Sequence, residues 1–110
     1  MDIEWLGDSL EVIRGYSEAV RKAIGSELRL LQTGEEPVHA RSLTTVGRGV
    51  WELKIREAGG QFRVIYVVKH RDRIYVLHVF QKKTRKAPRR EIELARARFK
   101  EIRGGTRNER

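Results

Sequence analysis

The chain has 110 residues, of which 39% are hydrophobic, and it contains no cysteine. This length fits one domain with a modest core, and the lack of cysteine excludes a disulfide framework, a thiol nucleophile and a cysteine-based zinc site. The net charge is +9, and residues 82–110 hold twelve Lys/Arg against four Glu, a net charge of +8 for that segment alone.

The basic C-terminal segment predicts a polyanionic partner, nucleic acid before a membrane, because lysine and arginine displace counterions from phosphates. A solvated basic helix without a ligand is the alternative. The first five residues include two acids where a secretory leader would be basic and apolar, and no apolar stretch reaches the length of a membrane span. The sequence therefore predicts a soluble, cytoplasmic protein.

The N-terminal third predicts a short strand and two helices. Residues 2–6 alternate in polarity, as a half-buried strand does, and residues 10–14 suit a short helix. Ser17 suits the N-cap of a longer helix, in which apolar residues recur every three or four positions. This stripe consists of Val20, Ile24, Leu28 and Leu31. Gly34 ends the helix, and residues 38–49 are expected to form a loop.

Three strands follow, in which polarity alternates residue by residue. They span residues 51–56, 62–69 and 74–80, with turns at Gly59-Gly60 and His70–Arg73. Because these turns are too short for a crossover, the strands must pair antiparallel. Beyond Pro88, residues 91–102 predict a helix that ends at Gly104-Gly105.

Together these elements predict an α+β fold. An N-terminal helical hairpin packs on a small twisted antiparallel sheet, and a basic C-terminal helix closes the structure. No repeat or linker indicates a second domain, so we expect a single domain over residues 1–103 and a polar tail over residues 104–110.

The sequence offers a basic sheet face but none of the usual cofactor motifs. The three histidines lack metal-ligand spacing, and no glycine-rich motif suits a nucleotide, so no metal or cofactor is predicted. Lys54 and Arg56 share one strand face by the period of two, and Arg63 lies across the Gly59-Gly60 turn. We expect these three cations to lie close together on the face that points away from the core.

A basic face of this kind can cut RNA without a metal ion. The ribose 2′-hydroxyl attacks the neighbouring phosphate when one group accepts its proton, another protonates the leaving 5′-oxygen, and cations stabilise the phosphorane. Arginine suits the last role because its donors form a fork. Lysine can act as the base when neighbouring cations lower its pKa.

Several segments of the chain carry a family resemblance. They are VWELKIR at Val50–Arg56, FRVIY at Phe62–Tyr66, LHVFQKKT at Leu77–Thr84, Pro88, the helix at Glu91–Arg98, and LLQTGE at Leu30–Glu35 with Pro37. In this order they resemble the RelE/HigB toxin superfamily, and within it the phage-derived branch, over roughly residues 5–103. Within them, the segments WELK at Trp51–Lys54 and FQKKT at Phe80–Thr84 are specific in combination, whereas either alone is a weak signal.

This resemblance implies a RelE-like fold and a metal-independent endoribonuclease that cleaves messenger RNA on the ribosome, with its active residues on the concave face of the sheet. The implied catalytic residues are Lys54, Arg56, Arg63 and Lys83, with Lys82 as the alternative to Lys83. Arg63 falls on the family's phosphate-contacting arginine. The basic residues after the third strand are the predicted RNA contacts: Lys82, Arg85, Lys86, Arg89 and Arg90.

His78 is the remaining candidate for acid or base. Many relatives supply a tyrosine or histidine near the C-terminus for this role, and this chain has neither after His78. By strand alternation His78 shares a side with Ile74, Val76 and Phe80. A histidine at the edge of the core is therefore the alternative interpretation.

The resemblance also implies two partners: messenger RNA on the ribosome, and a cognate antitoxin of the helix-turn-helix type, through which alone the chain would reach operator DNA. Two other functions remain open. ParE-like relatives share the architecture and poison DNA gyrase without cutting RNA, and a non-catalytic RNA- or DNA-binding module would use the basic surface alone. The cluster of Lys54, Arg56 and Arg63 favours the nuclease over the gyrase poison.

Overall fold

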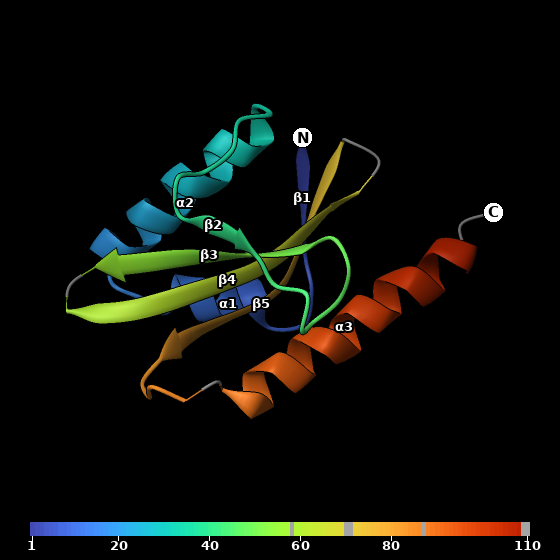
Figure 1. The fold of residues 1–110 in the computed structure, drawn as a ribbon. Coiled ribbons are helices and arrows are strands. Elements are labelled where there is room, and N and C mark those ends of the chain that lie inside the picture. Colours follow the sequence, from blue (N-terminus) through green and yellow to red (C-terminus); the bar gives the residue numbers. More distant parts are fainter. Residues whose placement is uncertain (58, 70–71, 87, 109–110) are drawn as a thin grey trace.

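The computed structural model describes residues 1–57, 59–69, 72–86 and 88–108, the last six of them as backbone only. In chain order the elements are β1 (Asp2–Trp5), α1 (Ser9–Arg14), α2 (Glu18–Gln32), β2 (Ala40–Ser42), β3 (Val50–Glu57), β4 (Gly60–Lys69), β5 (Arg73–Lys82) and α3 (Arg89–Asn108) (Figure 1). The α+β class is confirmed. Ser17 caps α2 as expected, because its hydroxyl accepts the Val20 N–H.

The sheet has five strands in the order β1-β5-β4-β3-β2. The three alternating segments are β3, β4 and β5, and they pair antiparallel as predicted. Two expectations are wrong. β1 runs parallel to β5, so the sheet is mixed, and residues 40–42 of the expected loop form β2, antiparallel to β3. Alternating polarity identifies a strand but does not show which strand it pairs with. The three residues of β2 are too few to show a period.

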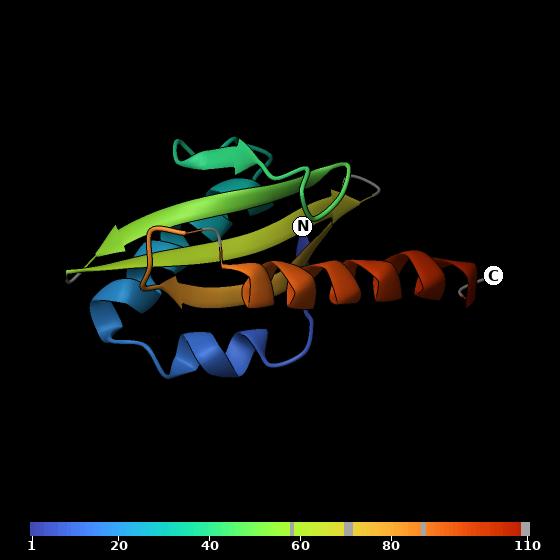
Figure 2. The ribbon, with the colours of Figure 1, turned by 60° about the horizontal axis from the view of Figure 1, so that its bottom comes forward.

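Helices cover both faces of the sheet (Figure 1, Figure 2). On one face α1 and α2 pack on the strands. That cluster contains Ile13, Val20, Ile24, Leu28, Leu31, Leu53, Ile55, Phe62, Val64, Tyr66, Ile74, Val76 and Val79. On the other face α3 packs on the strands. This second cluster contains Val46, Val50, Ile65, Val67, Leu77, Phe80, Ala95, Phe99 and Ile102. The predicted helical hairpin and closing C-terminal helix are both confirmed.

The C-terminal helix is longer than expected. α3 continues through Gly104 and Gly105 to Asn108, so its predicted end at Gly104 is wrong. A glycine costs a helix about 1 kcal/mol relative to alanine, which weakens the helix without ending it. Residues 70–71 of the expected turn and residues 109–110 of the expected tail lie outside the described residues. None of the described helices is long and apolar enough to cross a membrane.

A bulge in β5 decides which of its side chains face α3. The register pairs Ile65 with His78 and then Tyr66 with Val76, which leaves Leu77 as an extra residue. Beyond the bulge the alternation changes sides, so Val76 packs toward α1 and α2 whereas Phe80 packs toward α3. The expectation that His78 and Phe80 share a side with Val76 is therefore wrong, because one extra residue inverts the parity.

Candidate functional site

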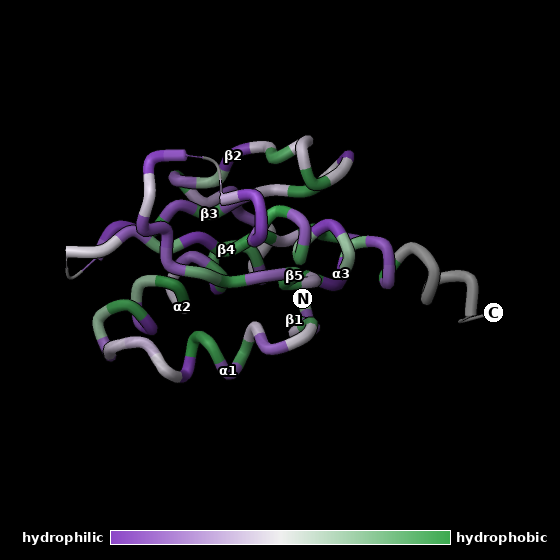
Figure 3. The backbone as a smooth tube through the Cα atoms, turned by 90° about the horizontal axis from the view of Figure 1, so that it is seen from below, coloured by the Kyte–Doolittle hydropathy of each residue, from purple (hydrophilic) through white to green (hydrophobic). Residues whose placement is uncertain are grey.

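A groove of about 740 Å³ lies on the α3 side of the sheet, between the strands and α3. Seven cations and two carboxylates are among its lining residues: Arg41, Lys54, Arg63, Lys82, Arg85, Arg89 and Arg96, with Glu52 and Glu93. They come from four strands, the segment between β5 and α3, and α3 itself. Figure 3 shows the β5–α3 segment as largely hydrophilic. The groove therefore gathers positive charge from most of the chain, not from the C-terminal segment alone.

Strand register brings three of these cations together. Lys54 on β3 is the direct partner of Arg63 on β4, and Gln61, two residues before Arg63, is the partner of Lys82 on β5. Residues two apart on a strand share a face, so all three cations leave the sheet toward the groove. The Lys82 ammonium also donates to the Thr84 carbonyl oxygen at 2.6 Å, which fixes its position. The expected proximity of Lys54 and Arg63 is confirmed.

Arg63 points away from the core cluster under α1 and α2, toward the α3 side, and its side chain is buried, at 9% exposed. Its Nε lies 3.4 Å from a carboxylate oxygen of Glu52, which is equally buried. The other oxygen of Glu52 lies 3.4 Å from the Nε of Arg41. The terminal nitrogens of Arg63 donate to the Phe62 carbonyl at 3.3 Å and to the exposed Gln61 side chain at 3.2 Å. Glu52 thus orients two arginines, and Arg63 is fixed before any ligand arrives.

The environment of Lys54 lowers the pKa of its amine. Burial lowers the pKa of Lys54, and the positive charges of Arg41, Arg63 and Lys82 lower this pKa further, against the opposing effect of Glu52. A lysine with a lowered pKa carries more of the neutral form, which is the form that accepts a proton. Neighbouring cations were the expected cause, and the structure adds burial as the larger one.

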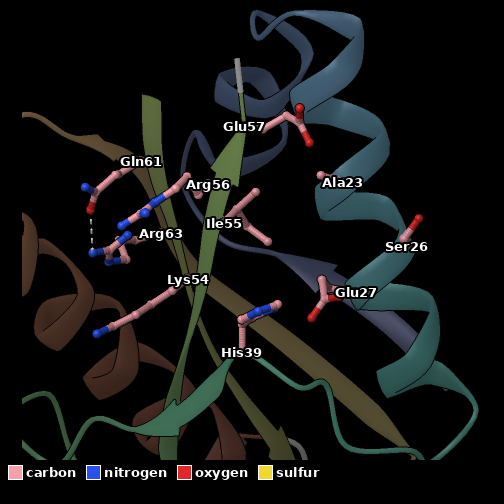
Figure 4. Close-up of a pocket in the computed structure, with 10 residues that line it drawn as sticks. All are labelled: Ala23, Ser26, Glu27, His39, Lys54, Ile55, Arg56, Glu57, Gln61 and Arg63. Carbon is pink, nitrogen blue, oxygen red and sulfur yellow. Dashed lines mark hydrogen bonds between the residues drawn. The ribbon is translucent and has the colours of Figure 1, made fainter. Parts of the chain in front are cut away.

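Arg56 is exposed and lies apart from the groove. It lines a second hollow, of about 700 Å³, between α2 and the part of β3 that lies beyond its pairing with β2. Figure 4 shows the side chains of Lys54, Arg56 and Arg63 on one side of β3, with Glu27, which comes from α2, and His39 on the other. Lys54 and Arg63 line both hollows. Arg56 therefore lies near these two cations, as expected, but outside the groove itself.

The cations after β5 divide into two sets. Lys82, Arg85 and Arg89 line the groove, whereas Lys83, Lys86 and Arg90 are exposed and outside its lining. Strand alternation explains the difference between Lys82 and Lys83, because it places Lys82 and not Lys83 on the α3 side. Sequence reasoning missed Arg41, whereas Arg96 was counted only as part of the basic C-terminal helix. Nothing in the expected loop marks Arg41, but Arg96 follows Arg89 by seven residues, or two helical turns on one face.

Both ring nitrogens of the buried His78 are engaged. Its Nδ1 lies 3.0 Å from a guanidinium nitrogen of Arg98, and because arginine only donates, Nδ1 must be the acceptor. Nε2 then carries the proton and donates to a Glu91 oxygen at 2.6 Å. Arg98 also donates to the Leu77 carbonyl and pairs with Asp8. This geometry joins β5 to α3 and favours the core-edge interpretation, while a catalytic role for His78 stays a prediction.

The loop before β3 is held against α3. Arg96 donates through Nε to the Thr45 carbonyl oxygen at 3.2 Å. A Cβ atom at Gly47 would lie 2.3 Å from the Phe99 ring, so only glycine allows this approach. The wall of the groove is therefore part of the packed structure.

Comparison with known proteins gives one family. The model described as "Phage derived protein Gp49-like (DUF891)" matches residues 11–100, which include α2, the strands β2–β5 and the first three turns of α3. None of the curated proteins matches the chain.

Proposed function

Because the chain belongs to the Gp49-like family of phage-derived proteins, which is associated with toxin–antitoxin systems and related to RelE/HigB, we propose that it is a toxin that cleaves messenger RNA without a metal ion. The family supports a toxin with an antitoxin partner. Cleavage of RNA, dependence on the ribosome and a cytoplasmic site of action are the further steps of the proposal.

The observation that carries the proposal is the groove in which Lys54, with a lowered pKa, lies opposite Arg63, while Lys82 lines the same groove from the far side of β4. Neutral Lys54 accepts the proton of a ribose 2′-hydroxyl, and the 2′-oxygen attacks the adjacent phosphorus. Arg63, released from Gln61, donates to the phosphorane oxygens. The bond from phosphorus to the 5′-oxygen then breaks, and the Lys82 ammonium protonates that oxygen. The products are a 2′,3′-cyclic phosphate and a 5′-hydroxyl end.

The remaining predicted residues take supporting roles. Arg85 and Arg89 line the groove and contact the RNA backbone, with the exposed cations Lys83, Lys86 and Arg90 adding attraction along the same segment. Arg56 adds a further cation at the edge of β3. A helix-turn-helix antitoxin would silence the toxin and carry it to operator DNA.

Brief induction of the protein, followed by mapping of messenger RNA 5′ ends, tests the proposal. We expect new 5′-hydroxyl ends within coding regions on translated messages, and none when translation initiation is blocked. Gyrase-linked DNA breaks with intact messages would support the ParE-like alternative instead. Intact messages and intact DNA would support a binding module.

His78 offers a second test, because its geometry predicts a structural role. We expect His78→Ala to lower stability by about 1–3 kcal/mol, since Glu91 and Arg98 lose their shared partner. The folded fraction should cleave RNA at close to the wild-type rate. Thermal melting and single-turnover cleavage on one preparation measure both. A folded His78→Ala protein without cleavage would make His78 the acid or base after all.

A further inference from the structure

A third cavity, of about 420 Å³ and here called the basic pocket, lies beyond the groove. Four cations line it: Arg48 from the loop before β3, Lys69 at the end of β4, and Arg96 and Lys100 on α3. None of the described residues that line it is acidic. Four like charges in one concavity repel one another, so the pocket is suited to an anionic ligand that neutralises them.

The pocket is built by packing and not by a mobile tail. Arg96 is tied to the Thr45 carbonyl, and Gly47 lets the loop approach the Phe99 ring. The Lys69 ammonium lies 6.0 Å from the centroid of that ring, a distance at which a cation is attracted to the aromatic face. Cations positioned in this way lose less entropy on binding a ligand than free side chains do.

The pocket adjoins the groove, because Arg96 lines both. Along β4, six residues separate Arg63 in the groove from Lys69 in the pocket, a span of roughly 20 Å at about 3.3 Å per residue. We propose that this pocket is a second phosphate-binding site, which holds the backbone of the same RNA strand several nucleotides from the cleaved bond. The inference rests on the proposed function and extends it from the cleaved phosphate to a longer RNA footprint.

The test compares two RNAs that carry 2′-O-methyl groups and therefore cannot be cleaved. At 3.4 Å per stacked nucleotide, 20 Å spans about six nucleotides, so an RNA of about four nucleotides fills the groove alone and one of about twelve also reaches the pocket. The variant is Arg48→Gln with Lys100→Gln, both exposed side chains. The matched control is Arg14→Gln with Arg29→Gln, exposed on α1 and α2.

For the long RNA, we expect the pocket variant to lose roughly tenfold in affinity at physiological salt and to lower the slope of log affinity against log salt by about 1.4, or 0.7 for each phosphate contact. For the short RNA its affinity should match the wild type. The control should match the wild type with both RNAs.

Equal losses of affinity with both RNAs, or an equal loss in the control, would overturn the proposed phosphate site. Such a result would attribute the affinity to the overall charge of the protein. Loss of antitoxin affinity with RNA affinity unchanged would overturn it in favour of an acidic protein segment. Failure of the pocket is distinguishable from failure of the proposed function. In the first case the wild type still produces new messenger RNA ends in cells, and in the second it produces none, whether or not it binds RNA.

Discussion

Replacement of Arg63 by alanine should reduce single-turnover cleavage of ribosome-bound messenger RNA by 100-fold or more. A donor to a developing oxyanion contributes about 3–4 kcal/mol, and each 1.4 kcal/mol is about a factor of ten in rate. The structure adds a cost in stability that a solvated arginine would not carry. Arg63 is buried against Glu52, whose remaining ion-pair partner among the described residues is the more exposed Arg41. We expect a loss of about 1–3 kcal/mol in the free energy of unfolding.

Because Arg63→Ala weakens the fold, two further variants isolate its role in cleavage. Arg63→Lys keeps a positive charge near Glu52 but lacks the forked donors, so it should melt near the wild type and still cleave slowly. Arg41→Ala removes the other partner of Glu52 at an exposed position and should leave more activity than either change at Arg63. Normal cleavage by a folded Arg63→Lys protein would contradict the assignment of a forked phosphate contact to Arg63.

The local part of the site was predictable from the sequence. Lys54 and Arg63 lie on adjoining strands of one hairpin, so the period of two and the position of the turn are enough to place them together. Gly59 has a φ of 76°, which suits the predicted glycine turn. Helices α1 and α2 were predictable for the same reason, since their apolar stripes and the Ser17 cap are local patterns.

The rest depends on contacts between distant segments, which no local pattern records. By strand alternation Glu52 has the place of an ordinary surface charge, but the pairing of β2 with β3 brings Arg41 to it and buries it beside Arg63. The bulge at Leu77 inverts the parity of β5 without a glycine or proline to mark it. The contacts of His78 with α3 follow from that inversion. Strand parity is therefore reliable only as far as the first bulge.

Replacement of Lys54 by methionine should separate activity from stability. Loss of the base should slow cleavage by roughly 100- to 10,000-fold. Lys22→Met is the matched control, because Lys22 is exposed on α2 and pairs only with Glu18 among the described residues. It should cleave and melt as the wild type does. Lys54→Arg should also fail to cleave, since arginine keeps its proton at any accessible pH.

The lowered pKa of Lys54 fixes the sign of two pH effects. Cleavage should rise tenfold per pH unit while Lys54 is mostly protonated and level off below the ordinary lysine pKa of about 10.4.

Between the folded and unfolded pKa values the unfolded chain binds more protons at Lys54, so this residue makes the free energy of unfolding rise with pH in that window. At neutral pH the half-buried ammonium of Lys54, close to other cations, is therefore unfavourable to the fold, and Lys54→Met should melt at or above the wild-type temperature. Lys54 would then lower the stability of the fold and still be required for cleavage, which is expected of a residue that serves the chemistry. A Lys54→Met protein that melts well below the wild type, or that still cleaves messenger RNA, would contradict the assignment of Lys54 as the base.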